Sequence, residues 1–172
     1  MPRRLKHGIA PFLLTVLALS GLIAPSAAQA ATWAACGKSS KTTKPVRTFD
    51  RYRGDDGSGH VLRGGESKLR CGTGGEKGWS FRHIFSEHRT HWERDAFLTG
   101  KDWRTHTDWA IDLVLGDPDE VSYEADNDTF IYCRQIVLAT TRGQVLKYKY
   151  PRVVVAAGTT NIISAYPRRD RC

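Results

Sequence analysis

Residues 78–95 read GWSFRHIFSEHRTHWERD, and the sequence changes character at this stretch. From this stretch into the next residue, four apolar side chains and one histidine recur at spacings of three or four residues: Phe81, Phe85, His88, Trp92 and Ala96. This is the period of an amphipathic helix, so the stretch predicts a helix with an apolar stripe that faces a core. A second helical pattern covers residues 101–116 and ends at Gly116 with Pro118 beyond it, which is a usual stop signal.

The chain after the helices has the pattern of strands. Apolar and β-branched runs occupy residues 120–125, 130–141, 145–157 and 162–167, and short turn sequences separate them. Because short turns join antiparallel neighbours, these runs predict a four-stranded antiparallel sheet. The expected fold class is α+β, with two or three N-terminal helices packed on one face of the sheet.

The beginning of the chain has the three parts of a signal peptide. Residues 1–8 are basic, residues 9–24 are apolar, and residues 25–30 are small and end in Ala-Gln-Ala. We therefore exclude residues 1–30 from the fold. The expectation is a secreted protein with no stable membrane insertion after the signal is cleaved.

Residues 31–77 are rich in Gly, Ser and Lys and are expected to be irregular, with one short strand near Val61 and Leu62. Residues 78–172 form the expected functional domain. The cysteines are Cys36, Cys71, Cys133 and Cys172. An even number of cysteines in an exported chain predicts two disulfides that staple the fold, and three pairings are open.

Charge is distributed in three blocks along the exported part of the chain. Residues 36–104 hold 15 basic and 9 acidic side chains, residues 105–133 hold no basic and 8 acidic ones, and residues 134–172 hold 8 basic and 1 acidic. This pattern predicts a polarised surface that is positive where the first and last blocks meet. Mixed, solvated faces are the plain alternative.

Three of the six histidines lie within nine residues, and helical geometry predicts how they are arranged. Residues four or eight apart share a face of an α-helix, whereas residues five apart diverge by about 140°. His83 and His91 therefore line up, while His88 falls on the apolar stripe and faces the sheet. A histidine on such a stripe is often a core residue with satisfied hydrogen bonds, which is the simplest interpretation of His88.

A zinc enzyme is an alternative reading of the histidine-rich stretch. Its candidate ligands are His83, His88, His91 and His106. Zinc-binding helices usually carry histidines four residues apart with a carboxylate base, and the spacing of five and then three does not place these side chains on one face. We therefore expect no metal ion and no other cofactor.

The strands supply groups that suit phosphodiester chemistry. The basic side chains are Arg134, Lys147, Lys149 and Arg152, and the hydroxyl-bearing ones are Thr159, Thr160, Ser164 and Tyr166. RNA cleavage by transesterification needs a base for the ribose 2′-OH, an acid for the leaving 5′-oxygen and fixed cations for the developing phosphorane charge. A solvated face is the simpler explanation of alternating lysines, and Arg134 could merely pair with an acid.

The segment GWSFRHIFSEH, the helix after it, the four strands and the last strand NIISAYP together resemble bacterial RNase toxins of the barnase, EndoU, colicin and RelE superfamily. The resemblance covers about residues 78–167. It implies metal-independent RNA cleavage with RNA as the partner and with a proteinaceous inhibitor or immunity protein as a further candidate partner. The catalytic set that it implies is His83, His88, Arg134, Ser164 and Tyr166. Arg82, Lys147 and Thr160 are the expected substrate-binding residues.

A secreted, disulfide-stapled protein without enzymatic activity is the alternative function. Small proteins of this kind are often protease inhibitors or binding modules, and their rigid exposed loops make the contacts. Residues 53–78 are the candidate loop, although they carry no recognisable reactive-site sequence.

Overall fold

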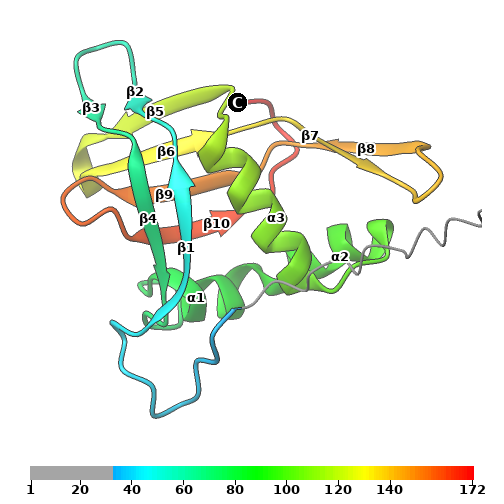
Figure 1. Ribbon diagram of the computed structural model, residues 1–172, viewed down its shortest axis with the longest axis horizontal. Coiled ribbons are helices and arrows are strands. Elements are labelled where there is room, and N and C mark those ends of the chain that lie inside the picture. The colour runs from blue at the N-terminus through cyan, green and yellow to red at the C-terminus, as the bar shows by residue number, and fades with distance from the viewer. Residues whose placement is uncertain (1–32) are drawn as a thin grey trace, which may run out of the picture.

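The computed structural model describes residues 33–172, so the predicted signal peptide at residues 1–30 lies outside the described part of the chain. Strands occupy both ends of this part, and helices lie between them (Figure 1). The elements in chain order are β1 (Pro45–Arg51), β2 (Gly54–Asp55), β3 (Val61–Leu62), β4 (Gly65–Arg70), α1 (Ser80–His83), η1 (Ile84–His88), α2 (Arg89–Thr99), α3 (Trp103–Gly116), β5 (Glu120–Glu124), η2 (Ala125–Asn127), β6 (Thr129–Cys133), β7 (Ile136–Ala139), β8 (Val145–Lys149), β9 (Arg152–Ala156) and β10 (Ile162–Tyr166). The fold is α+β with antiparallel strand pairs, as the sequence predicted.

The largest sheet has four antiparallel strands in the order β10-β9-β6-β5. Its register aligns Tyr166, Arg152, Cys133 and Glu120 in one row. The preceding residue of β10, Ala165, is aligned with Val153 and Tyr132, and all three are fully buried. Because side chains alternate along strands, one face of the sheet packs on the core and the row that contains Tyr166 lies on the opposite, open face.

The strands of this sheet are shorter than the sequence runs predicted. Residues 130–141 and 145–157 were each expected to form one strand, but each run divides between two sheets. Strands β7 and β8 form a separate antiparallel hairpin that projects from the body of the molecule (Figure 1). Pro151 lies at the break between β8 and β9, where a residue without a backbone N–H cannot continue a ladder.

The N-terminal segment is more regular than its composition indicated. Strands β1 and β4 pair along most of their length, although residues 31–77 were expected to be irregular. The expected short strand at Val61 and Leu62 is present as β3 and pairs with β2. Buried side chains such as Phe49 and Leu69 dock the β1–β4 hairpin on the core, and a bridge from Lys68 to Asn161 joins it to the chain just before β10.

The first predicted helix is a single rod made of α1, the π-turn η1 and α2. A π-turn contains one more residue than an α-helical turn. Residues eight apart on an α-helix are rotated by about 80°, and this extra residue cancels most of that rotation. Ile84 and Trp92 are therefore both fully buried, while Phe85, predicted on the apolar stripe, is 41% exposed.

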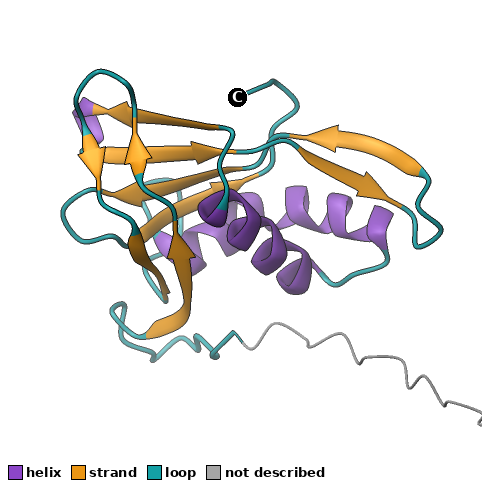
Figure 2. Ribbon diagram, turned by 45° about the horizontal axis from the view of Figure 1, so that its top comes forward, coloured by secondary structure: helices purple, strands orange, loops and turns teal. Residues whose placement is uncertain are grey.

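The second predicted helix is α3, which spans 14 residues. Asp102 caps its N-terminus by accepting hydrogen bonds from the backbone N–H groups of Arg104 and Thr105. The helix buries Ile111 and Val114 completely, and it packs on β1, β6 and β9. The helices lie on one side of the main sheet (Figure 2). No helix in residues 33–172 is long and apolar enough to cross a membrane.

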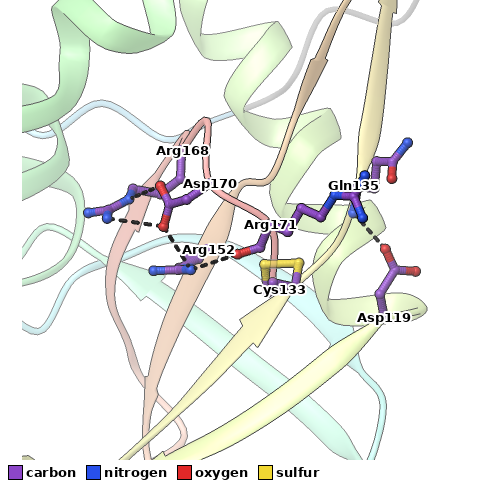
Figure 3. The surroundings of a disulfide bond; sticks show 8 residues. Asp119, Cys133, Gln135, Arg152, Arg168, Asp170 and Arg171 are labelled. Carbon is purple, nitrogen blue, oxygen red and sulfur yellow. Dashed lines mark hydrogen bonds and ion pairs between the residues drawn. A yellow bond between two sulfur atoms is a disulfide. The ribbon is translucent and has the colours of Figure 1, made fainter.

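Both predicted disulfides are present. Cys36 bonds to Cys71 and Cys133 bonds to Cys172, with sequence separations of 35 and 39 residues. The second bond ties the C-terminal residue to the end of β6 (Figure 3). These pairings resolve the choice that the sequence left open.

Candidate functional site

The π-turn brings three histidines together. The ring centroids of His83 and His88 are 5.1 Å apart, and those of His88 and His91 are 6.2 Å apart. The α-helical expectation, in which His83 and His88 diverge, is wrong because η1 places residues five apart next to each other. Single π-turns inside α-helices occur frequently at functional sites.

A glycine-rich loop fixes the orientation of His83. The Nδ1 atom of His83 lies 2.9 Å from the carbonyl oxygen of Gly75, and the backbone N–H of Gly75 donates to Ser86 Oγ at 2.9 Å. Because a carbonyl oxygen only accepts hydrogen bonds, this contact requires a proton on Nδ1. The Nε2 atom of His83 is then the one available to exchange a proton.

The loop itself depends on Gly72. This residue has a φ of +61°, and a Cβ atom there would lie 1.8 Å from the carbonyl oxygen of Trp79. The close approach forms a small antiparallel bridge between Thr73 and Trp79, which returns the chain to the start of α1. The backbone conformation of residues 72–79 thus positions the Gly75 carbonyl against the helix.

His88 is half-buried between the other histidines and the last strand. Its ring centroid is 5.2 Å from that of Tyr166, and its buried Nδ1 atom has no hydrogen-bond partner among the described residues. Burial, strengthened by the nearby charges of His83 and His91 and opposed by Glu87, lowers the pKa of His88 to about 4. His88 is therefore neutral at pH 7 and can accept a proton.

The last strand contributes Tyr166 and Ser164 to the same face of the sheet. Tyr166 is partly exposed, whereas Ser164 is only 6% exposed and its Oγ atom has no hydrogen-bond partner in residues 33–172. Arg152 is the direct cross-strand neighbour of Tyr166. Its guanidinium donates to Asp170 Oδ2 at 3.2 Å and to the Arg171 carbonyl at 3.1 Å (Figure 3).

A groove begins beside the histidines and is mainly basic. It has a volume of about 560 Å³, and helix α2, strand β8 and the residues after β10 line it. Its lining side chains are His91, Arg94, Asp95, Leu98, Lys147, Lys149, Pro167, Arg168, Arg169 and Asp170. The groove joins the first and third charge blocks, as the sequence predicted for the positive surface.

Two of the cations that line the groove are free to contact an anion. Lys147 and Arg169 are exposed and make no ion pair or side-chain hydrogen bond with any of residues 33–172. Lys149 differs because its Nζ atom pairs with Asp95 Oδ2 at 2.9 Å, and both residues are buried. This ion pair anchors the base of the β7–β8 hairpin to α2.

The structure does not bring Arg134 to the histidines. Arg134 follows β6, and Cys133, its neighbour, is two strands away from Tyr166, or about 10 Å at the usual strand spacing. The guanidinium of Arg134 pairs with the Asp117 carboxylate at the end of α3. Arg134, which was predicted to be catalytic, therefore lies away from the histidine cluster and pairs with Asp117.

Two of the predicted substrate-binding residues also have other roles. The guanidinium of Arg82 donates to three backbone carbonyls, those of Gly72, Gly37 and Ser40, at 2.7–2.9 Å. Thr160 lies in the turn before β10, at the opposite end of the strand from Tyr166, and its carbonyl accepts the N–H of Lys68. Lys147 is the one predicted substrate-binding residue that lines the groove.

The alternative hypothesis of a zinc site has no geometric support in the described residues. Between Trp33 and Cys172, no group of three or more His, Cys, Asp or Glu side chains is arranged to hold a metal ion. His106, one of the four proposed ligands, lies in the core against Trp92 and Trp109 and is 0% exposed.

Sequence reasoning missed two parts of this site. It considered His91 only as a zinc ligand, although residues three apart, such as His88 and His91, are neighbours on an ordinary α-helix. It also treated the glycines of residues 72–78 as irregular linker, although two neighbouring glycines in GTGGEKG are a signal for a constrained loop.

The chain is similar to two curated proteins of Mycobacterium tuberculosis, one from strain CDC 1551 / Oshkosh and one from strain ATCC 25618 / H37Rv. Each is 32% identical over 151 residues, which covers 81% of this chain, and both are described as uncharacterized. The aligned region is 51% of each relative, so the chain spans about half the length of these proteins. No family model and no solved structure matches the chain.

Proposed function

We propose that this protein is a secreted, metal-independent endoribonuclease that cleaves RNA by transesterification at the histidine cluster. The observation that carries the proposal is the convergence of His83, His88 and His91 on the π-turn, beside Tyr166 and at the head of a basic groove. Proton-transferring groups next to fixed cations are what phosphoryl transesterification needs.

In the proposed mechanism, His88 is the general base. It is neutral at pH 7 because its pKa is about 4, and it takes the proton of the ribose 2′-OH. The 2′-oxygen then attacks the adjacent phosphorus and the bond to the 5′-oxygen breaks, which leaves a 2′,3′-cyclic phosphate. His83 donates a proton from Nε2 to the departing 5′-oxygen while its Nδ1–H stays on the Gly75 carbonyl.

The negative charge that develops on the phosphate needs fixed donors. Tyr166, whose ring centroid lies 5.2 Å from that of His88, supplies one hydroxyl donor, and the cations Lys147 and Arg169 lie along the groove that begins at His91. Arg134 has no part in the proposed mechanism because its guanidinium pairs with Asp117, away from the histidines. RNA affinity should decrease steeply with salt concentration, since phosphate contacts release counterions.

The resemblance to the barnase, EndoU, colicin and RelE superfamily supports the same proposal. A four-stranded antiparallel sheet with a histidine-bearing helix along its last strand fits that expectation. Export is supported by the two disulfides, which fit an oxidising environment, and by the sequence of residues 1–30. An acidic inhibitor or immunity protein would suit the charge of the groove.

The test is incubation of the oxidised protein, from Ala31 onward, with total RNA in excess EDTA. We expect cleavage that persists under chelation and is abolished by His88→Ala. Removal of a general base typically costs about 10²- to 10⁴-fold in rate. Cleavage that EDTA abolishes would contradict the metal-independent mechanism, and the absence of cleavage by the folded protein would favour a non-enzymatic binding function.

His60→Ala is the matched control. His60 is an exposed histidine that pairs with Asp56 at 2.8 Å and stacks on Tyr123, outside the cluster and the groove. We expect this variant to cleave RNA at the wild-type rate. Equal loss of activity in the His60 and His88 variants would show that the assay does not report on the proposed site.

A further inference from the structure

Exposed apolar side chains are concentrated in one part of the molecule. Nine large apolar or aromatic residues in the described chain are exposed, and six of them lie at the end of α2 or in the β7–β8 hairpin. These six are Phe97, Leu98, Val137, Val145, Leu146 and Tyr148. Phe97 is the most exposed of the nine, at 84%. We call residues 94–101 together with residues 136–149 the hairpin lobe.

The two segments of the hairpin lobe are neighbours in space. Helix α2 packs on β7, and Leu98 and Lys147 line the same groove. The hairpin and the end of α2 extend to the same side of the molecule in both views (Figure 1 and Figure 2). The register pairs Val137 with Tyr148 and Ala139 with Val145, so Val137, Val145 and Tyr148 share the hairpin face opposite the buried Ile136 and Leu138. An exposed apolar face of this kind usually marks an interaction site.

All of the exposed charge of the hairpin lobe is positive. The hairpin sequence contains no acidic residue, and the exposed cations of the lobe are Arg94, Lys101, Arg142 and Lys147. Its single carboxylate, Asp95, is buried and paired with Lys149. The neighbouring Asp102 uses its carboxylate to cap α3.

We propose that the hairpin lobe binds the surface of an anionic lipid bilayer. Aliphatic and aromatic side chains with basic neighbours match the boundary between lipid headgroups and acyl chains, where apolar burial and attraction to anionic lipids act together. The hairpin has two free strand edges with unpaired backbone groups. It therefore lies at the hydrated interface and does not enter the hydrocarbon layer.

Other occupants fit the hairpin lobe less well. A second copy of the chain would bring a lobe of the same positive charge, and like charges oppose association. Nucleic acid suits the basic groove that Lys147 lines, but it binds by phosphate contacts and base stacking, and the exposed aliphatic side chains Val137, Val145 and Leu146 outside that groove offer neither. An acidic protein with an apolar groove is the remaining alternative, and the experiment distinguishes it from lipid.

The experiment is co-sedimentation of the oxidised chain, from Ala31 onward, with vesicles of equal phosphatidylglycerol and phosphatidylcholine. Omission of residues 1–30 prevents their apolar segment from binding lipid itself. At about 0.15 M salt we expect binding to these vesicles and much weaker binding to phosphatidylcholine alone, and at about 1 M salt the difference should largely disappear. The readout requires no ribonuclease activity, so it is independent of the proposed function.

Matched variants separate the apolar and the electrostatic parts. The Val137→Ser/Tyr148→Ser double variant, which removes a cross-strand apolar pair from the exposed hairpin face, should bind anionic vesicles about tenfold more weakly or worse. Tyr52→Ser, at a 63% exposed tyrosine outside the hairpin lobe, should bind like the wild type. Each of Lys101→Gln and Arg142→Gln should weaken binding about fivefold. Both cations lie outside the groove lining, so RNA cleavage should be unchanged.

The following results would overturn the proposal. One is equal binding to anionic and neutral vesicles, and another is a loss with Tyr52→Ser as large as that with the double variant. The absence of binding to either vesicle would also overturn it and would leave an acidic protein as the occupant.

Discussion

Acidification should destabilise the protein through one buried histidine, His106, by about 3 kcal/mol between pH 7 and pH 4. The ring of His106 is 0% exposed, and neither of its nitrogens has a hydrogen-bond partner in residues 33–172. Burial lowers its pKa from 6.5 to about 4; Asp95 opposes this shift, and the charges of Lys101 and Lys149 add to it. His106 is thus neutral in the folded protein at pH 7.

The sign and size of the effect follow from proton linkage. Between pH 6.5 and pH 4 the unfolded chain binds a proton at His106 that the folded chain does not bind, so the free energy of unfolding falls as the pH falls. This contribution is fully present above pH 6.5 and is lost as the pH approaches 4. A pKa difference of about 2.5 units corresponds to about 3 kcal/mol.

The assay is urea unfolding of the wild type and of His106→Leu at pH 7 and pH 4. Leucine cannot titrate, so the variant should lose about 3 kcal/mol less than the wild type over this range. The other titrating groups, including His88, are common to both proteins and cancel in the difference. An equal loss of stability in the two proteins would refute the claim that His106 is held neutral by burial.

Two further variants test the packing that supports the site. Lys149→Met should lower the free energy of unfolding by about 3–5 kcal/mol because it leaves the Asp95 carboxylate buried without a partner. The Asp95→Leu/Lys149→Met double variant should recover most of this loss in urea titrations. No recovery in the double variant would contradict this explanation. Gly72→Ala should prevent folding or lower the free energy of unfolding by more than about 2 kcal/mol, because its Cβ would meet the Trp79 carbonyl. Gly57→Ala is the control: Gly57 also has a positive φ but faces open space, so this variant should lower the free energy of unfolding by about 1–2 kcal/mol in thermal unfolding. Similar losses at the two glycines would refute the role of the close approach.

The sequence was sufficient for the parts of the fold that depend on local periodicity. The spacing around Phe81 and Trp92 predicted a buried helix, and the stop at Gly116 coincides with the end of α3. The even number of cysteines predicted two disulfides, and both are present. Each of these predictions rests on neighbours within a few turns of the chain or on simple chemistry.

The sequence-based predictions that were wrong concern features that depend on contacts between distant residues. Strands β1 and β4 contain few apolar residues, and Phe49 and Leu69 are buried because they dock on the core that the rest of the chain builds. Arg134 pairs with Asp117, which lies 17 residues earlier at the end of α3, and this pairing keeps its guanidinium away from the histidines. Neither relation leaves a periodic signal in the sequence.

The π-turn had the largest consequence for the candidate site. No residue in IFSEH forbids an ordinary α-helical turn, so the sequence predicted that His83 and His88 diverge. Tertiary packing favours the extra residue because it allows both Ile84 and Trp92 to reach the core, and Trp92 Nε1 donates to the Ala165 carbonyl at 3.0 Å. The histidines are brought together as a result of that packing.

The most direct test of the proposed function uses a defined oligoribonucleotide and analysis of the product ends in excess EDTA. The account predicts fragments that end in a 2′,3′-cyclic phosphate, formed by the wild type and not by His88→Ala. A single 2′-deoxy substitution at the cleaved nucleotide should block cleavage there, since it removes the nucleophile. Cleavage at that 2′-deoxy position, or fragments formed at the wild-type rate by the His88 variant, would contradict transesterification at the histidine cluster.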